Sequence, residues 1–157
     1  MNPCPCGYLG ATHKNWRYTP DQVGRYQSRL SGPLIDRIDL HVEVPAIASA
    51  ELLQAAPGEP SESIRRRCGE ARQRALQRQG KANHALQGKE IDLHLLLEDA
   101  AAKFMNVAAA RLGWSARGTH RVLKVARTIA DLAGAQSTQV NHFAGAMQYR
   151  MVLRPGR

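Results

Sequence analysis

The stretch that most constrains the fold of this chain runs from Ser115 to Gly134, because it contains a helical pattern with both of its end signals. Ser115 is a favourable N-cap residue, and Gly134 is a favourable residue just past a last helical turn. Apolar residues recur between them at the spacing of one helix face; these are Val122, Val125, Ala126, Ile129, Ala130 and Ala133. The pattern predicts a helix that buries this face in a helical core.

Arg117 is the unusual residue of this helix. Apart from Asp131, the charged residues of the stretch are all basic: Arg117, Arg121, Lys124 and Arg127. Arg117 falls in the first turn, where the positive end of the helix dipole disfavours a cation. A phosphate bound at the free N–H groups of the helix start would explain a guanidinium there. From this helix alone, a solvated arginine is the simpler interpretation.

The charge of the chain is concentrated in its later part. The net charge is +9 over 157 residues, but residues 1–60 carry five basic and six acidic side chains, whereas residues 61–157 carry 17 and seven. Such a surplus attracts polyanions, namely nucleic acid, nucleotides or an acidic subunit face. Only 5% of the residues are aromatic, so we expect a core of aliphatic residues between helices.

The sequence contains no apolar run of transmembrane length and no leader pattern for secretion. Its three cysteines are too few for a disulfide framework, which favours a reducing compartment. We therefore expect a cytoplasmic protein without a membrane segment. The abrupt start at MNPCPCG suggests a fragment of a longer protein.

The first third of the chain predicts one helix and one strand. Thr19 followed by Pro20 is a good helix start, and the helix is expected to reach about Leu30. Residues 40–44 alternate between apolar and polar side chains before Pro45, which predicts a half-buried strand. A connection over residues 46–60 follows, with one helical turn in it.

A long arginine-rich helix is predicted from Ser61, its N-cap, to about Gln79. Its inward residues are expected to be Ile64, Cys68, Ala71 and Ala75. Its other faces carry six arginines, Arg65, Arg66, Arg67, Arg72, Arg74 and Arg78. A solvated surface and a surface for DNA or a neighbouring subunit explain them equally well. The candidates for such a contact are Arg65, Arg66, Arg72 and Arg74.

Further helices are predicted around residues 91–96, 98–112 and 137–149, with polar or glycine-containing breaks between them. The sequence therefore predicts an antiparallel bundle of four or five helices over residues 61–150.

Three separated motifs share a resemblance to one family. MNPCPCG, RLSGPLIDRIDLHVEV and SARGTHRVLKVARTIADLAG occur in this order, and together they resemble the second half of the Mg-chelatase-like AAA+ ATPases of the ComM (YifB) type. The resemblance covers nearly the whole chain. It implies a mainly α fold in which a helical lid domain follows a remnant of the AAA+ α/β core. The implied divisions are core remnant 1–45, linker 46–60, lid 61–150 and tail 151–157.

The resemblance implies roles for three residues. Asn2 matches the sensor-1 asparagine, which orients the attacking water near the γ-phosphate of ATP. Arg37 matches the arginine finger that reaches into the nucleotide site of a neighbouring subunit, although its position between Asp36 and Asp39 also suits an exposed salt-bridged residue. Arg117 matches the sensor-2 arginine, which contacts the γ-phosphate from the first turn of a lid helix. Phosphoryl transfer depends on such positive groups, and arginine stays protonated at any working pH.

The same resemblance implies that the parent protein hydrolyses ATP with Mg²⁺ as a homo-hexameric ring that remodels DNA. The chain contains no G-x-x-x-x-G-K-[ST] and no strand ending in paired acids, so we expect those parts upstream and expect this chain alone to be inactive. The family's second C-x-C pair is replaced here by Trp16 and Tyr18, which leaves Cys4 and Cys6 short of the four ligands of a structural zinc site. We expect no metal in this part of the protein.

Two alternatives remain at this point. The segment ARLGWSARGTHRVLKVA has the appearance of a helix-turn-helix DNA-binding module, but Arg117 and Arg121 provide few groups to read bases. The other alternative is an ATPase subunit of magnesium chelatase, a metal-insertion motor that shares the same residues.

Overall fold

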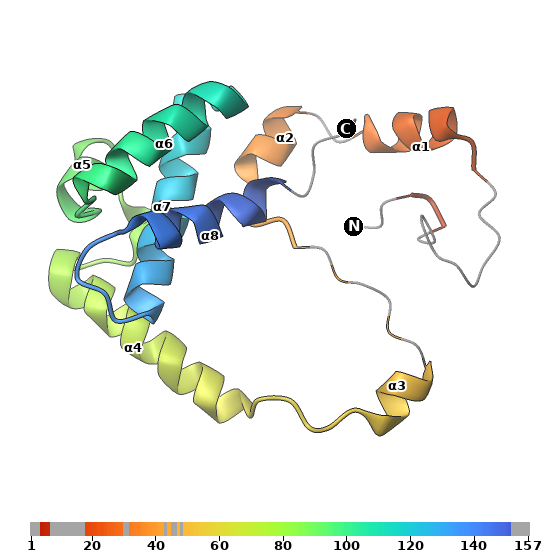
Figure 1. The fold of residues 1–157 in the computed structure, drawn as a ribbon, viewed down its shortest axis with the longest axis horizontal. Helices are drawn as coiled ribbons and strands as arrows, with labels where there is room; N and C mark the ends of the chain where they lie inside the picture. The colour runs from red at the N-terminus through yellow and green to blue at the C-terminus, as the bar shows by residue number, and fades with distance from the viewer. Residues whose placement is uncertain are drawn as a thin grey trace. The chain divides into compact units, whose positions relative to one another are not determined.

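The structure is a computed structural model that describes residues 4–6, 18–29, 32–42, 44, 47 and 49–151. Within these ranges the regular elements are all helices, which confirms the mainly α fold that the sequence predicts but not its one strand (Figure 1). The chain divides into two compact units, one of residues 1–55 with 152–157 and one of residues 56–151. No helix in the described part of the chain is both long and apolar enough to cross a bilayer.

The described residues of the first unit form three short helices: α1 (Pro20–Gln27), α2 (Gly32–Arg37) and α3 (Ser49–Gln54). The predicted start of α1 is confirmed, because Thr19 and Gln22 form a reciprocal capping box. The Thr19 backbone N–H donates to Gln22 Oε1 at 2.9 Å, and the Gln22 backbone N–H donates to Thr19 Oγ1 at 3.4 Å. The helix ends at Gln27, three residues before the predicted end at Leu30.

The predicted strand over residues 40–44 is wrong for the residues of it that the structure describes, 40–42 and 44. The residues before it form helix α2, and Leu40, Val42 and Val44 are 49%, 65% and 82% exposed. A strand needs a neighbour to accept and donate its backbone hydrogen bonds. No described segment of this chain is a strand that could pair with it.

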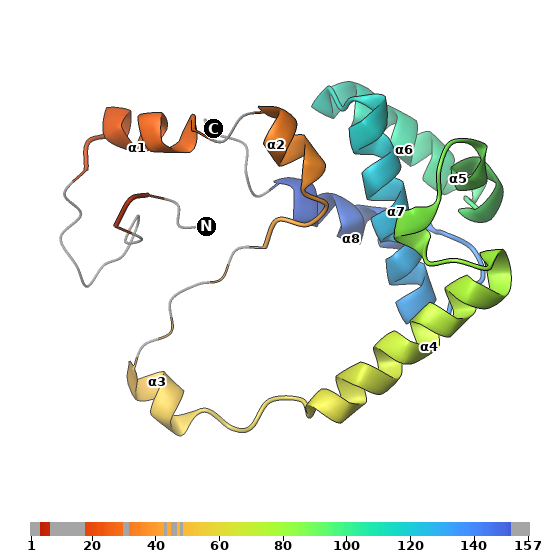
Figure 2. The ribbon, with the colours of Figure 1, turned by 180° about the vertical axis from the view of Figure 1, so that it is seen from behind.

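The second unit is a helical bundle, as predicted. Its elements are α4 (Ser61–Gln79), the 3₁₀ turn η1 (Asn83–Ala85), α5 (Lys89–His94), α6 (Asp99–Leu112), α7 (Ala116–Leu132) and α8 (Val140–Met151). Helix α7 is the central element, since α4, η1, α5 and α8 all pack against it (Figure 2). Helix α6 packs on α8. The helix predicted from Ser115 to Gly134 is therefore the one around which this unit is built.

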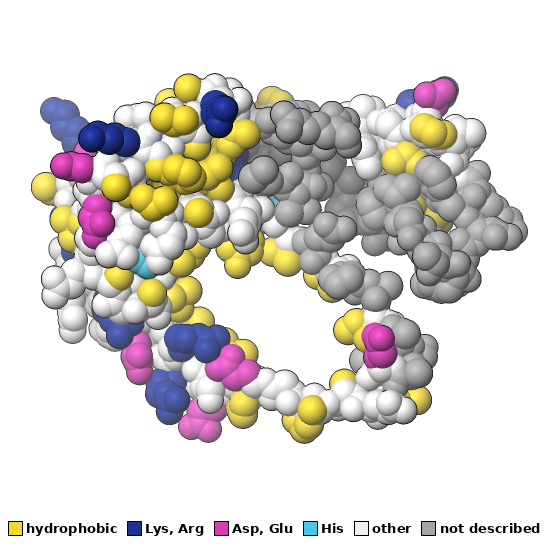
Figure 3. Space-filling view, in the orientation of Figure 1, with side chains coloured by type: hydrophobic (Ala, Val, Ile, Leu, Met, Phe, Trp, Pro, Cys, Tyr) yellow, Lys and Arg dark blue, Asp and Glu magenta, His cyan; other side chains and the backbone are white. Residues whose placement is uncertain are grey.

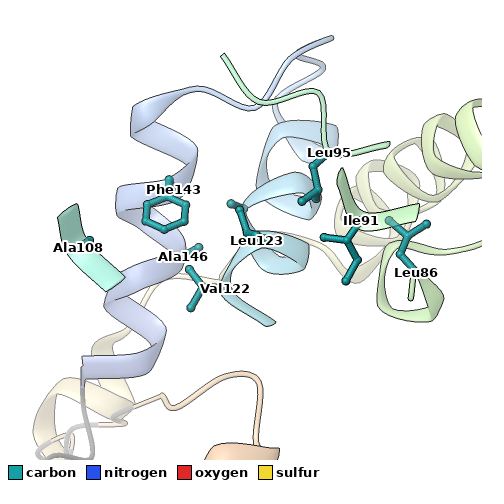
Figure 4. Close-up of a cluster of buried hydrophobic side chains, with 9 residues drawn as sticks. Leu86, Ile91, Leu95, Ala108, Val122, Leu123, Phe143 and Ala146 are labelled. Atoms are coloured by element: carbon teal, nitrogen blue, oxygen red, sulfur yellow. The ribbon is translucent and has the colours of Figure 1, made fainter. Parts of the chain in front are cut away.

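The hydrophobic core lies between α7, α8 and the α5–α6 region (Figure 4). Its buried members are Leu86, Ile91, Leu95, Ala108, Val122, Leu123, Ala126, Phe143 and Ala146. Phe143 contacts two aromatic rings, with centroid distances of 5.8 Å to Phe104 and 6.4 Å to Trp114. The predicted stripe of α7 is correct for Val122, Ala126 and Ala130 but wrong for Ala133, which is exposed.

Helix α4 differs from its prediction in its first half. Pro60, not Ser61, occupies the N-cap position, and no side chain caps the helix start. Ala71 and Ala75 are buried as predicted, whereas Ile64 is 41% exposed and Cys68 is exposed. The reason is that the first turns of α4 extend beyond the end of α7, as both ribbon views show (Figures 1 and 2).

Candidate functional site at the start of α7

The start of α7 has the geometry that its sequence predicts. Gly113 has a φ of +61°, a left-handed conformation that ends α6 and turns the chain into the next helix. Ser115 Oγ accepts a hydrogen bond from the Gly118 backbone N–H at 3.0 Å. This cap leaves Arg117 as the second residue of the helix, and the first turn contains no acidic residue. The positive end of the helix dipole is thus not neutralised by the helix itself.

Arg117 has an exposed side chain. Within the described residues, its guanidinium makes no ion pair and no hydrogen bond. The simple expectation for a cation held at a helix N-terminus is that a nearby acid compensates it, and that compensation is missing. The five N–H donors of this guanidinium are therefore available to an anion from outside the second unit.

Arg127 lies on the same helix but, unlike Arg117, is buried and fully hydrogen-bonded. Its side chain is 1% exposed, and all five of its N–H donors are taken. Two of them reach Asp131 Oδ1, from Nη2 at 2.8 Å and from Nε at 3.2 Å. The others reach the carbonyl oxygens of Ala135 and Gln136, at 2.7 Å and 2.8 Å, and Thr138 Oγ1 at 3.4 Å. Arg127 thus fastens the loop between α7 and α8 to the end of α7.

Asp131 is the centre of this network and is also 1% exposed. Arg78 of α4 donates to both of its oxygens, at 2.7 Å and 3.0 Å. Asn83 of η1 donates to Oδ2 at 2.8 Å. Burial by itself would raise the pKa of Asp131, but the hydrogen bonds from Arg78, Arg127 and Asn83 outweigh it and keep the pKa below its usual value.

The network joins four segments of the second unit: α4, η1, α7 and the α7–α8 loop. Arg74 adds to it, since its Nη1 donates to the Asp131 carbonyl oxygen at 2.7 Å. Sequence analysis did not identify these contacts. The available signal was that Asp131, the one acid of the helix, stands four residues after Arg127. That spacing is the same for a buried pair and for a surface pair, so the burial could not be predicted from it.

The six arginines of α4 fall into two groups. Arg67, Arg74 and Arg78 are engaged inside the chain: Arg67 pairs with Glu59 at 2.8 Å and 3.1 Å, and the other two contact Asp131. The remaining three, Arg65, Arg66 and Arg72, are exposed, and their side chains pair with no acid in the described residues. Of the four predicted contact residues, the structure therefore leaves three available and uses Arg74 within the unit.

The two other predicted nucleotide residues belong to the first unit. Asn2 lies outside the described residues. Arg37 is the last residue of α2, and its side chain is exposed. Arg37 is thus placed at a helix C-terminus, where a cation is favoured by the dipole.

The cysteines and the acids provide no metal centre in the part of the chain that the structure describes. Cys4 and Cys6 are free thiols whose sulfur atoms lie 3.3 Å apart. No group of three or more His, Cys, Asp or Glu side chains in the described ranges is arranged to hold a metal ion.

Comparison with known proteins gives the same family along the whole chain. Residues 58–150 match the model of the C-terminal part of magnesium chelatase subunit ChlI, and residues 1–52 match the model of magnesium chelatase subunit ChlI itself. The chain is 43% identical over 155 residues to competence protein ComM of Haemophilus influenzae, and 40% and 39% identical to the uncharacterized protein YifB of Salmonella typhimurium and of Escherichia coli. Each alignment covers 98% of this chain and 30% of the relative. The chain therefore spans about a third of the length of these relatives.

Proposed function

Because the chain belongs to the Mg-chelatase-like AAA+ proteins of the ComM/YifB type, we propose that it forms the C-terminal part of a cytoplasmic, ATP-driven ring motor. In this proposal Arg117 contacts the γ-phosphate of ATP, Arg37 reaches the nucleotide of a neighbouring subunit, and Asn2 orients the attacking water. The rest of the nucleotide site comes from the part of the relatives that this chain does not cover.

The observation that carries the proposal is the uncompensated guanidinium of Arg117 beside the open N-terminus of α7. A phosphate placed there meets backbone N–H groups, the positive end of the dipole and a planar fork of donors at once. Such groups stabilise the charge that develops on the phosphate oxygens during transfer. The helix start is also fixed by its Ser115 cap, so the guanidinium is held at a defined end of a packed helix.

The residues of the chain fit the phosphates of ATP better than they fit Mg²⁺. Arginine side chains are suited to phosphate oxygens, whereas Mg²⁺ takes oxygen ligands such as carboxylates. The described part of the chain contains no carboxylate cluster for a metal ion. Bound Mg²⁺ would neutralise phosphate charge during hydrolysis, and we assign its ligands to the remainder of the protein.

The work performed by the motor is proposed to be DNA remodelling, such as branch migration. The supports are the name of the competence protein ComM and the basic surplus of residues 61–157. The second candidate is metal insertion, which the description of the matching family models favours. Stimulation of ATP hydrolysis by DNA distinguishes the two, because a metal-insertion motor has no reason to respond to it.

A steady-state ATPase assay on the full-length protein tests the role of Arg117. Arg117→Ala should lower the turnover rate by about 10²-fold, and Arg117→Lys should recover only part of it, since lysine lacks the planar fork. Arg111→Ala removes another exposed arginine, at the end of α6, and should leave the rate unchanged. Equal rates for Arg117→Ala and Arg111→Ala would contradict the proposal.

A mixing experiment tests Arg37. A ring of Arg37→Ala subunits should be inactive, and so should a ring whose subunits lack the lysine of the G-x-x-x-x-G-K-[ST] motif that we expect upstream of this chain. Mixed rings should regain activity, because an intact site can then receive an arginine from a neighbour that is defective only in its own site. If mixing restores nothing, Arg37 does not act across the subunit boundary.

A further inference from the structure

The second unit exposes two small patches that are apolar in the middle and charged at the edge. The first, the α4 patch, consists of Ile64, Arg65, Cys68 and Arg72 on the projecting half of α4. Ile64 is 41% exposed, and the other three are exposed. Arg65 and Arg72 are two helical turns apart, about 10 Å along the axis, and they border the apolar pair on one side of the helix.

The second patch, the α5 patch, consists of Asp92, Leu93, Leu96 and Asp99 at the α5–α6 turn. Leu93 is 68% exposed and Leu96 is 48% exposed, and both acids are exposed. Figure 3 shows acidic side chains over α5, and both basic and acidic side chains along α4. No cation in the described residues pairs with either acid.

Leu96 is held outward at a conformational cost. Its φ is +48°, the left-handed region that non-glycine residues rarely adopt. The backbone is fixed there by a short parallel bridge, in which the Thr138 N–H donates to the Leu96 carbonyl at 2.9 Å and the Glu98 N–H donates to the Thr138 carbonyl at 3.2 Å. The unit thus keeps an exposed leucine in a rigid position between two acids.

The two patches complement one another. Each offers two exposed apolar side chains and two charges that have no partner of opposite sign within the described residues, and the charges are of opposite sign. They lie on different elements of one unit, so a single copy presents both. Two different surfaces that fit each other make a head-to-tail contact, which closes into a ring or continues as a chain of subunits.

We infer that the α4 patch of one copy of this protein docks on the α5 patch of a second copy. The arginine pair of α4 then faces the Asp92 and Asp99 carboxylates, while Ile64 and Cys68 cover Leu93 and Leu96. The inference deepens the proposed ring motor, on which it rests, by naming the surface through which the second unit meets its neighbour. It also accounts for the first half of α4, where Ile64 and Cys68 are exposed.

Two charge-reversed versions of the 157-residue chain test the inference. One carries Arg65→Glu with Arg72→Glu, and the other carries Asp92→Arg with Asp99→Arg. Sedimentation measured without nucleotide at about 50 mM NaCl should show self-association of the unaltered chain, weakened about tenfold at about 500 mM. Each altered chain alone should stay monomeric, because both of its patches then have the same sign. An equimolar mixture of the two should associate again, because every contact between unlike chains pairs opposite charges.

The matched control is Arg66→Glu with Arg111→Glu, which reverses two exposed arginines outside both patches and should associate like the unaltered chain. All substitutions are at exposed positions, and unchanged melting temperatures establish that the variants are folded. Failure of the mixture to associate overturns the inference, as does a loss of duplex-DNA binding in the Arg65/Arg72 variant without any change in association. This test is independent of the proposed ATP site, because Arg117→Ala should leave the self-association of the chain unchanged.

Discussion

The two ends of α7 each carry an arginine, and the two arginines differ in their burial and in their hydrogen bonds. At the C-terminal end, Arg127 is 1% exposed and has every donor occupied by its own unit. At the N-terminal end, Arg117 is exposed and has no partner among the described residues. The difference indicates that the fold depends on Arg127 but not on Arg117, and it fits the contact with the γ-phosphate that we propose for Arg117. Substitution of Arg127 should therefore lower the stability of the fold, whereas substitution of Arg117 should lower ATP hydrolysis and leave stability unchanged.

The largest expected effect comes from breaking the network at its centre. Asp131→Ala leaves the buried guanidinium of Arg127 and the largely buried side chain of Arg78 without their carboxylate, which costs about 3–5 kcal/mol of the free energy of unfolding. Urea unfolding of the chain checks this value. Asp92→Ala, at an exposed position, should change the same quantity by less than about 0.5 kcal/mol. Similar small losses for both variants would contradict a structural role for Asp131.

Replacing each arginine by lysine sharpens the comparison because the charge is kept. Arg127→Lys has three donors in place of five, so at least two of the five hydrogen bonds that Arg127 makes are lost, and we expect a loss of about 1–3 kcal/mol. Arg117→Lys should leave unfolding unchanged within about 0.5 kcal/mol. Thermal melting of both variants decides the matter. A larger loss at Arg117 than at Arg127 would reverse our assignment of the two ends.

The cap of α7 should make a smaller contribution. Ser115→Ala removes the hydrogen bond to the Gly118 N–H, and the loss of such a cap costs about 1 kcal/mol. Ser61→Ala is the matched control, because Ser61 begins α4 without capping it. Denaturant unfolding should therefore show a lower free energy of unfolding for Ser115→Ala and no change for Ser61→Ala.

The smallest effect should be a dependence of stability on pH near neutrality. Burial lowers the pKa of His142, and the charge of Arg127 lowers it further, while Glu98 opposes the shift. The unfolded chain then takes up the proton first, so the free energy of unfolding is highest above about pH 6.5 and falls as the pH drops below that value. His142 Nδ1 also accepts the Gln139 N–H at 3.1 Å, a bond that protonation would remove. His142→Gln should flatten the profile between about pH 7.5 and 5.5; an unchanged slope would exclude His142 as its cause.

Features that depend on local chemistry could be predicted from the sequence, with the exception of the N-cap at Ser61, and those that depend on a packing partner could not. The caps at Thr19 and Ser115 follow from neighbouring residues, and the structure confirms both. The prediction of a strand over residues 40–44 was wrong because an alternating pattern does not show whether a second strand is present to pair with it. The apolar stripe of α4 failed at Ile64 for the same reason, since periodicity does not reveal how far the facing helix extends.

The residues of the candidate site could be predicted only in part. Arg117 was noticed because a cation at a helix start contradicts the dipole, but its role at the γ-phosphate came from the family resemblance and stays a prediction. The roles of Asn2 and Arg37 came from the family resemblance and stay predictions. The network of Asp131 was missed because its members come from segments about 50 residues apart, such as Arg78 and Asp131. Contacts at that separation depend on the packing of the whole bundle.

The most direct test of the central claim is the preference of the full-length protein for ATP over ADP, measured as the ratio of the two dissociation constants in Arg117→Ala and in Arg111→Ala. If Arg117 contacts the γ-phosphate, its removal should weaken ATP binding by about tenfold or more and leave ADP binding nearly unchanged, so that the preference is lost only in Arg117→Ala. An unchanged preference in both variants would contradict the account.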